Sequence, residues 1–478
     1  SKNRILAMVK DRPDWCVSRQ RSWGVPITIF ISKKQKKPLI DIDVNKNIIS
    51  LLEDNGVDFW FESSGKSFLP KKYNYSDYEK VTSILDVWFD SGSSHVYVLK
   101  NNGISVKADL YLEGSDQHRG WFQTSLLESC GIYGESPYKS VLTHGFVIDE
   151  KGKKMSKSLG NVISPKDIVN KYGADILRIW VASSNYNEDI RISYENLNRH
   201  SESYRKVRNT IRFILGNLNG WNLDNKIAYD ELPELEKYIL HKVKKINSEV
   251  QVFFNQFNFS KAFQLILSFC SSDLSSFFFD IRKDALYCED KNSNLVRSTK
   301  TVMSIIFNCL VRWLSPIIPF TTEEAWQCWK NEIDSDAEVS CHLLKKPEIP
   351  DDWLNSKLED RWRKIFEIRD TFMLSVETKR NLKEIKSSME VKAKFFFKDQ
   401  EYVKIAESLD LSVILIASEV SLSAKVDDEF NNYPGKENIF CKIEVTNGFK
   451  CPRCWKVIEK FDRSTEICDR CESVIGAS

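Results

Sequence analysis

Apolar positions change their spacing along the chain, and the change predicts two kinds of structure. In the first third, short apolar runs end in Gly, Ser or Asp, as in "ILDVWFDSGSS" and "ADLYLEG". We interpret them as buried strands of an α/β sheet whose strand ends carry ligands. From about residue 197 to 330 the apolar residues recur at helical spacing, which predicts an α-helical bundle. They are Val207, Ile211, Ile214 and Leu218 on one stretch, and Val302, Ile305, Ile306, Cys309, Leu310 and Trp313 on another.

Cap and turn signals place the ends of several elements. Ser164 as N-cap and Pro165 in the first turn predict the start of a helix. Thr321 and Glu324 have the spacing of a capping box and predict another helix start. Within residues 391 to 417, "VKAKFFF" and "LSVILIA" predict strands of a small α+β module.

Composition and charge limit the class of protein. The 478 residues favour roughly three domains, and 28% charged with 42% hydrophobic residues is typical of a globular protein. The formal charge is only +2, so an anionic partner must bind to local basic patches. We find no apolar run long enough to span a membrane and no signal peptide, and expect a cytoplasmic protein without membrane contact. Twelve cysteines then indicate metal binding more than disulfides.

The last thirty residues contain two Cys-x2-Cys pairs separated by thirteen residues. This spacing places four thiolates around one zinc ion and leaves no coordination position open, so the predicted zinc is structural. The predicted ligands are Cys451, Cys454, Cys468 and Cys471. Nearby basic side chains are placed to offset the negative charge of the tetrathiolate and to face phosphates. Two disulfides or unligated thiols are the alternatives.

A short basic stretch, "KGKKMSKSLGN" or Lys151 to Asn161, is here called the lysine loop. Its four lysines suit a polyphosphate, and Gly152 and Gly160 allow such a loop to close over a ligand. It lacks the pattern of a P-loop. Taken alone, a solvated basic turn is the alternative.

Polar clusters follow two predicted strands just upstream of the lysine loop. "YLEGSDQHRGWFQ" provides Glu113, Gly114, Asp116, Gln117, His118, Arg119, Gly120 and Gln123, and "VLTHGFVID" provides His144 and Gly145. Ligands of α/β proteins bind at successive strand ends, so we expect these clusters and the lysine loop to line one crevice.

Taken together, these stretches resemble class I aminoacyl-tRNA synthetases. "KMSKS" at 154–158 is similar to their second signature sequence. "DWCVSRQRSWGVPI", "DVWFDSGS", "YLEGSDQHRGWF", "VLTHGF" and the tail "CPRCW…ICDRC" resemble, within that class, the bacterial isoleucyl-tRNA synthetases. The resemblance runs from about residue 5 to the end and is less specific between 330 and 440.

The resemblance implies a multidomain α/β plus α fold. The implied parts are 1–163 as the second half of a Rossmann-like class I catalytic domain with a small insertion at 33–80, 164–196 as a stem-contact region, 197–345 as an α-helical anticodon-binding domain, 346–445 as an α+β junction module and 446–478 as a zinc-binding domain. None of the six histidines forms the family's His-x-Gly-His signature, and the inserted editing domain is missing. We therefore expect the C-terminal half of the enzyme, inactive on its own.

The implied reaction is ATP-dependent activation of isoleucine to isoleucyl-adenylate, followed by transfer to tRNA(Ile). Lys154 and Lys157 are the implied catalytic residues, and residues 154–158 (Lys154, Met155, Ser156, Lys157 and Ser158) the ATP-binding segment, with Mg²⁺ entering with ATP. The implied isoleucine or adenylate contacts are Trp88, Glu113, Gly114, Asp116, Gln117, His118, Trp121, Gln123, His144 and Gly145. Trp88 and Trp121 are equally consistent with plain core.

Binding to tRNA needs basic surface, and the segment 197–218 supplies it. The predicted contacts are Arg199, Arg205, Arg208 and Arg212 there, and Arg453 and Lys456 beside the cysteines. A solvated helix face is the alternative for the first four. The expected partners are tRNA(Ile), ATP and L-isoleucine, bound by a monomer. Two other functions stay open, namely a catalytically silent tRNA-binding fragment and an unrelated zinc-ribbon nucleic-acid protein.

Overall fold

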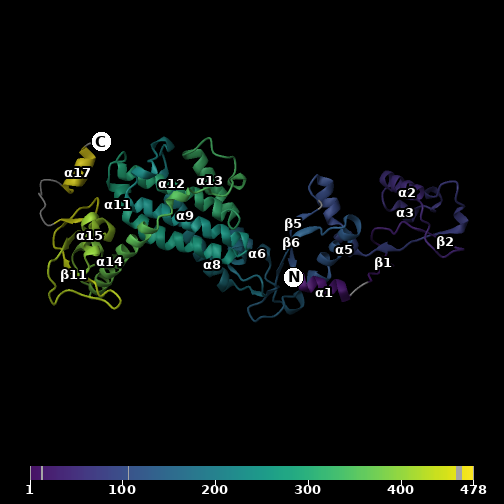
Figure 1. Ribbon diagram of the computed structural model, residues 1–478, viewed down its shortest axis with the longest axis horizontal. Helices are drawn as coiled ribbons and strands as arrows, with labels where there is room; N and C mark the ends of the chain where they lie inside the picture. The colour runs from purple at the N-terminus through teal and green to yellow at the C-terminus, as the bar shows by residue number, and fades with distance from the viewer. Residues whose placement is uncertain (1, 12–13, 106, 459–465, 477–478) are drawn as a thin grey trace. The chain divides into compact units, whose positions relative to one another are not determined.

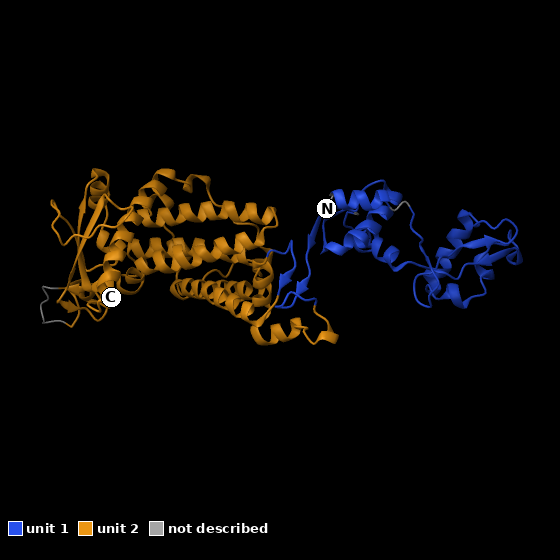
Figure 2. Cartoon of the chain, turned by 90° about the horizontal axis from the view of Figure 1, so that it is seen from below, with its two compact units in different colours: residues 1–154, 185–191 blue, residues 155–184, 192–478 orange. Residues whose placement is uncertain are grey.

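The computed structural model describes residues 2–11, 14–105, 107–458 and 466–476. The chain divides into two compact units, coloured separately in Figure 2. Unit 1 comprises Ser1–Lys154 and Asn185–Arg191, and unit 2 comprises Met155–Ser184 and Ile192–Ser478. Each unit is described on its own below.

Residues 30–80 of unit 1, which include the predicted insertion 33–80, carry a small core of their own. Strands β2 (Phe30–Ser32) and β3 (Tyr78–Lys80) pair antiparallel, and helices α2 (Ile42–Asn55) and α3 (Phe59–Glu62) lie between them in the sequence. The side chains of Phe30, Val44, Ile48, Trp60, Phe68 and Leu69 are buried together. Asp41 caps α2 by accepting from the backbone N–H of Asp43 at 2.7 Å.

The rest of unit 1 is built around one βαβ crossover. Strand β5 (Ala108–Gly114) and strand β6 (Tyr138–His144) pair in parallel, joined through α5 (Trp121–Tyr133). The other elements are α1 (Lys2–Asp11), the pair β1 (Ser18–Arg19) and β4 (Ile84–Leu85), α4 (Val87–Gly92), and the pair β7 (Val147–Ile148) and β8 (Ile190–Arg191).

Only one of the two strands predicted at the start of the chain is correct over its length. "ADLYLEG" is β5, although it is only partly buried. "ILDVWFDSGSS" is a strand for two residues and then turns into α4, so the strand prediction is wrong there. The physical cause is a cap, because the Asp86 carboxylate accepts from the backbone N–H of Trp88 at 3.2 Å.

Unit 2 begins with two short helices and continues as a helical bundle (Figure 1). Its helices are α6 (Pro165–Tyr172), α7 (Ala174–Ser183), α8 (Tyr194–Leu218), α9 (Glu234–Asn255), α10 (Phe259–Ser268), the π-helical η9 (Phe269–Phe278), α11 (Phe279–Cys288), α12 (Asn294–Leu314) and α13 (Pro319–Glu332). The apolar positions predicted on α8 and α12 are buried, except for half-buried Ile305, so the bundle prediction is confirmed.

One bundle segment corrects the expectation that no run is long enough for a membrane. The helical run Phe259–Cys288 reaches the length and hydropathy of a span, with a mean hydropathy of 1.3 over its best window. Half of that window is buried, and Phe263, Ile266 and Phe269 belong to the bundle core. A core helix of a soluble bundle passes the same test of length and composition.

The two predicted helix starts have different outcomes. Helix α6 begins at Pro165 with Ser164 as its N-cap residue, but the Ser164 side chain makes no cap hydrogen bond. Helix α13 begins two residues before Thr321, so the predicted capping box is wrong. Its first turn is instead capped from α7, where the Asp175 carboxylate accepts from the Thr321 backbone N–H at 2.8 Å and from its hydroxyl at 2.6 Å.

The remainder of unit 2 is a three-stranded sheet with helices, followed by the cysteine-rich tail. Strand β9 (Val391–Phe397) lies between parallel β10 (Glu419–Leu422) and antiparallel β11 (Ile439–Val445). The other elements are α14 (Ser356–Asn381), α15 (Gln400–Ser408), α16 (Leu411–Leu415), the pair β12 (Phe449–Lys450) and β13 (Val457–Ile458), and α17 (Asp469–Gly476). "VKAKFFF" is β9 as predicted, whereas "LSVILIA" is the helix α16, capped by Asp410.

Candidate functional site

Parallel pairing of β5 and β6 brings two predicted polar clusters to one sheet end. Glu113 pairs with Thr143 and Gly114 with His144, so both clusters start at the carboxyl ends of neighbouring strands. A Cβ on Gly114 would lie 2.7 Å from Asp116 Oδ1 and 3.8 Å from His144 Cε1. A side chain at position 114 would therefore displace the Asp116 carboxylate. We call residues 113–123 and 144–145 the strand-end cluster.

Side chains of the strand-end cluster divide into exposed and structural groups. Glu113 and Asp116 are exposed, so their carboxylates face solvent or a ligand. His118 is buried and its Nδ1 lies 2.8 Å from the Ser115 carbonyl oxygen. The Gln117 side-chain oxygen accepts from the Trp121 backbone N–H at 3.1 Å. His118 and Gln117 thus shape the turn η5 (Ser115–Arg119), and the carboxylates of Glu113 and Asp116 remain accessible.

His144 and Gly145 end the second strand of the cluster in a tight connection. His144 is half-buried, and its Nδ1 lies 2.8 Å from the Gly145 carbonyl oxygen. A Cβ on Gly145 would lie 2.3 Å from the Glu188 carbonyl carbon, so the backbone passes too closely for any other residue.

The two tryptophans proposed as walls for an amino-acid side chain differ in their surroundings. Trp121 stacks on Tyr111 with ring centroids 4.0 Å apart, and its indole N–H donates to the Ser91 carbonyl oxygen at 3.0 Å. Trp88 is 39% exposed and lies over Gly120, where a Cβ would come within 2.9 Å of its ring. Trp88 is therefore free to contact a ligand, while Trp121 supports the fold. Gln123 is buried and donates to a carbonyl of α1 at 3.4 Å.

A buried acid behind the cluster was missed by sequence reasoning. Both carboxyl oxygens of Glu128 are buried without a hydrogen-bond partner among the described residues. They lie against Gly92, where a Cβ would come within 2.2 Å of Oε1. Burial raises the pKa of Glu128 to about 8, and the Asp90 carboxylate adds to the rise. The available signal was an acid inside the apolar text "SLLESC".

The lysine loop is ordered by its glycines and by short-range hydrogen bonds. Gly152 and Gly160 have φ of 78° and 65°, the left-handed region that favours glycine. The Ser156 hydroxyl accepts from the Leu159 backbone N–H and lies 3.1 Å from the Ser158 hydroxyl. Lys157, at the start of η6 (Lys157–Leu159), is exposed and has no ion pair with any described residue. The division between the two units falls inside this loop, after Lys154.

The four predicted cysteines converge at the chain end. Cys451 Sγ lies 3.9 Å from Cys471 Sγ, and Cys454 Sγ lies 3.7 Å from Cys468 Sγ. All four sulfur atoms are buried within 4.8 Å of one another, and none forms a disulfide. Thiolates bound to one zinc ion at about 2.3 Å lie about 3.8 Å apart at tetrahedral angles. The donor set and its spacing therefore fit a structural zinc ion.

Burial raises the pKa of the Cys454 and Cys468 thiols, whereas the pKa of Cys451 is lowered. Burial raises the pKa of the Cys451 thiol, but hydrogen bonds from neighbouring backbone N–H groups outweigh it and hold the value at about 6. A hydrogen bond to the Cys471 sulfur raises the pKa of Arg453. We call the described residues 449–458 and 466–476 the zinc knuckle.

The six cations predicted to bind tRNA have different surroundings. Arg199 and Arg205 are paired with Glu195 and Glu202 on the same helix. Arg453 donates to a backbone carbonyl of α11, and Lys456 is half-buried without an ion pair to any described residue. Arg208 and Arg212 are exposed, make no ion pair within the described chain and line a groove of about 360 Å³ between α8 and α13.

A second group of possible metal ligands is explained without a metal. Glu323, Cys341 and His342 bring their ligand atoms within 4.8 Å of one another. The Glu323 carboxylate already accepts from the Cys341 backbone N–H at 3.0 Å and from the Ser340 hydroxyl at 2.8 Å. This carboxylate therefore holds the 340–342 turn against α13.

Three protein families match successive parts of the chain, in the order that the sequence resemblance implies. The family "tRNA synthetases class I (I, L, M and V)" matches residues 1–193. The "anticodon-binding domain of tRNA ligase" matches residues 236–395, and the "zinc finger found in FPG and IleRS" matches residues 448–474. The predicted fold class, with its catalytic-domain part, helical anticodon-binding domain and zinc-binding tail, is confirmed.

Relatives and solved structures agree with these matches. The isoleucine–tRNA ligases of Pelagibacter ubique and Zymomonas mobilis are 48% and 44% identical over 95% and 99% of this chain, and 49% of each relative is covered. The chain thus spans about half the length of the curated relatives it matches. Among solved structures, the LeuRS of Agrobacterium radiobacter K84 in complex with tRNA and LeuAMS superposes with a TM-score of 0.54 at 16% identity. The match covers 90% of this chain and 51% of that enzyme's chain, and it shows the fold alone. The family matches and the relatives together show that the chain belongs to the isoleucine–tRNA ligase family of class I tRNA synthetases.

Proposed function

We propose that this chain is part of a protein that activates isoleucine with ATP and transfers it to tRNA(Ile). The observation that carries the proposal is the strand-end cluster, where exposed acids and small residues follow two neighbouring parallel strands just before the lysine loop. Family membership supports the reaction class, because the relatives are isoleucine–tRNA ligases.

In the proposed first step, a carboxylate oxygen of isoleucine attacks the α-phosphorus of ATP. The bond between the α-phosphorus and the oxygen that bridges to the β-phosphate breaks. Negative charge therefore moves onto the departing pyrophosphate. Lys157, exposed and without an ion pair to any described residue, is proposed to bind this charge, and Lys154 is its proposed partner. Mg²⁺ enters with ATP as part of the substrate.

The strand-end cluster is proposed to hold the isoleucyl-adenylate. Glu113 is exposed at the strand end and suits the amino group or ribose of the adenylate. Trp88 suits the isoleucine side chain, because its ring is partly exposed beside Gly120. In the second step a terminal ribose hydroxyl of tRNA attacks the acyl carbon, and AMP leaves with the bonding electrons. Neither step needs a covalent enzyme intermediate, so positioning and charge stabilisation supply the catalysis.

Unit 2 is proposed to bind the tRNA. Arg208 and Arg212 support this role most directly, since they are one helical turn apart, exposed and unpaired within the described residues. Arg199, Arg205, Arg453 and Lys456 stay predicted contacts. We further propose a monomer and a cytoplasmic location, the latter supported by cysteines that form no disulfide among the described residues.

A second candidate function is tRNA binding without chemistry by these 478 residues alone. The observation that favours it is the two-stranded sheet β5–β6, on which Leu112 stays 49% exposed. Parallel sheets are normally covered on both faces, so this sheet is incompletely supported. In this candidate the longer protein, and not this part, performs the activation.

Amino-acid-dependent exchange between ATP and pyrophosphate in the longer protein tests the main proposal. Isoleucine, valine, leucine and methionine are compared at equal concentrations. We expect exchange with isoleucine to be the fastest, with valine next. Exchange that does not depend on the amino acid, or that prefers leucine or methionine, would contradict the proposal.

A further inference from the structure

Both halves of the zinc knuckle carry an arginine directly before their second cysteine. The sequences are Cys-Pro-Arg-Cys at 451–454 and Cys-Asp-Arg-Cys at 468–471. Arg453 and Arg470 therefore stand at equivalent positions next to two zinc ligands. Both guanidinium groups reach the same place, the last turn of α11.

The last turn of α11 provides two hydrogen-bond acceptors, the Asp284 carboxylate and the Cys288 carbonyl oxygen. Arg470 makes a bidentate pair with the Asp284 carboxylate, with both N–O distances at 2.7 Å. Arg453 donates to the Cys288 carbonyl oxygen at 2.7 Å. Because Cys288 is the last residue of α11, its carbonyl has no partner within the helix, and a cation is favoured at that end. Asp284 and Cys288 lie one turn apart, so both contacts fall on one helix face.

The Cys288 side chain is covered by this docking. Cys288 as a residue is 5% exposed, and its thiol donates to the Arg453 carbonyl oxygen at 3.4 Å and packs with the four knuckle cysteines. A fifth cysteine thus lies beneath the knuckle, and its exposure depends on whether the knuckle stays in place.

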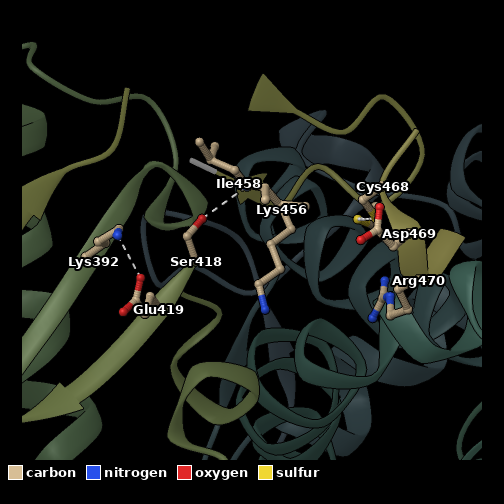
Figure 3. A pocket seen from close by; sticks show the side chains of 10 residues that line it. Lys392, Ser418, Glu419, Lys456, Ile458, Cys468, Asp469 and Arg470 are labelled. Atoms are coloured by element: carbon tan, nitrogen blue, oxygen red, sulfur yellow. Dashed lines mark hydrogen bonds and ion pairs between the residues drawn. The ribbon is translucent and has the colours of Figure 1, made fainter. Parts of the chain in front are cut away.

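The opposite side of the knuckle faces the three-stranded sheet. The Val457 backbone N–H donates to the Ser418 hydroxyl at 3.1 Å. Figure 3 shows the pocket of about 540 Å³ between them, with Lys392 paired to Glu419 on the sheet side and Arg470 beside Cys468 on the knuckle side. The knuckle is therefore attached to both α11 and the sheet module, and Lys456 extends between these attachments.

We infer that zinc coordination docks the knuckle on α11 through Arg453 and Arg470, and that Asp284 is a positioning residue for RNA binding. The ion would fix the distance between the two arginines, because each precedes a cysteine ligand and the four sulfur atoms share one centre. The RNA part of this inference rests on the proposed function, whereas the docking does not.

Alkylation of Cys288 in the 478-residue chain tests the docking without RNA. We compare the wild type with Asp284→Arg, which replaces the attraction to Arg470 by repulsion, and with the milder Asp284→Asn. Cys288 is labelled with a maleimide and located by peptide mass spectrometry, and zinc is measured on the same sample. We expect at least about tenfold faster labelling in Asp284→Arg, with zinc retained, and an intermediate rate in Asp284→Asn. Buried Cys270 and Cys309 must stay unlabelled, which shows that the bundle remains folded.

Charge exchange and a matched control decide the outcome. The double variant Asp284→Arg with Arg470→Asp restores the pair in reverse and should return Cys288 to the slow rate. Glu377→Arg, which breaks the exposed Arg380–Glu377 pair on α14 with the same change in charge, should leave Cys288 protected. Unchanged labelling in both single Asp284 variants, or no rescue by the exchange, would overturn the docking.

The RNA part has its own measurement. Asp284→Arg adds two units of positive charge, which by itself favours RNA binding. We nevertheless expect its affinity for a tRNA(Ile) transcript to fall about tenfold, and removal of zinc by a chelator to weaken the wild type but barely weaken the variant further. Equal or tighter binding by the variant would refute the positioning role. If the wild type does not bind tRNA(Ile), the proposed function fails, while the Cys288 result still decides the docking.

Discussion

The helical bundle of unit 2 and the strand-end cluster of unit 1 differ in how completely they are packed. The bundle shares one continuous hydrophobic core with the β9–β11 module, from Ile179 to Ile443. The sheet that carries the strand-end cluster has two strands, and its hydrophobic cluster of buried described residues is small, comprising Tyr111, Phe122 and Tyr138. Two-stranded sheets are marginal without further packing. The comparison teaches that the region proposed to bind RNA has the packing to fold by itself, and the proposed activation site does not.

The largest expected effect is complete loss of activation in the 478-residue chain alone. We expect no isoleucine-dependent exchange of pyrophosphate into ATP, because half a preorganised site loses most of its electrostatic advantage. The same chain should also fail to hydrolyse valyl-tRNA(Ile). Exchange by this chain at the rate of the longer protein would break the comparison, because the strand-end cluster would then be sufficient.

A smaller but still large effect is expected for Lys157→Ala in the longer protein. Exchange should fall by at least about tenfold, or roughly 1.4 kcal/mol of barrier, while tRNA affinity stays nearly unchanged. A charge that serves the transition state affects turnover more than ground-state binding. Lys151→Ala, in the same loop and equally exposed, is the control and should retain most of the rate. A fall of less than tenfold for Lys157→Ala would show that this lysine has another role.

Loss of the metal should affect the RNA-binding side selectively. We expect Cys468→Ser to remove the zinc and to impair charging of tRNA more than synthesis of adenylate, since a buried four-thiolate site is structural. Zinc content, charging and pyrophosphate exchange are measured on one preparation of the longer protein. Cys328→Ser, at an exposed cysteine outside the knuckle, is the control. Zinc content unchanged by Cys468→Ser, or equal loss in both assays, would be evidence against this assignment.

The smallest expected effect is a pH dependence of stability in unit 1. The pKa of Glu128 is raised by burial from 4.5 to about 8, so the folded unit holds a proton that the unfolded chain releases. Glu128 therefore lowers stability progressively as the pH rises from about 4.5 to about 8. Glu128→Gln should gain thermal stability over the wild type at pH 8 but little at pH 5. A difference in unfolding temperature that is the same at both pH values would show that the carboxyl group stays ionised in the fold.

Sequence patterns predicted those features of the structure that depend only on residues close together in the chain. Strand β5, helix α12 and the four zinc ligands were predicted from spacing alone, because each needs only a local period or a fixed ligand geometry. The predictions failed where one local cap overrode an apolar run, as Asp86 does for α4 and Asp410 for α16, and where a partner distant in sequence decides the structure. Asp175 caps α13 from 146 residues away, and Arg470 binds Asp284 across 186 residues. No local pattern contains such a contact.

Binding of tRNA(Ile) by the 478-residue chain tests the central claim most directly. The claim is that the bundle and the zinc knuckle form a complete RNA-binding region without a complete activation site. A tRNA(Ile) transcript and an unrelated tRNA are titrated against the zinc-loaded chain at two salt concentrations. We predict tighter binding of tRNA(Ile), weakened by salt because phosphate contacts release counterions. Equal affinity for both RNAs, or no binding at low salt, would contradict the claim.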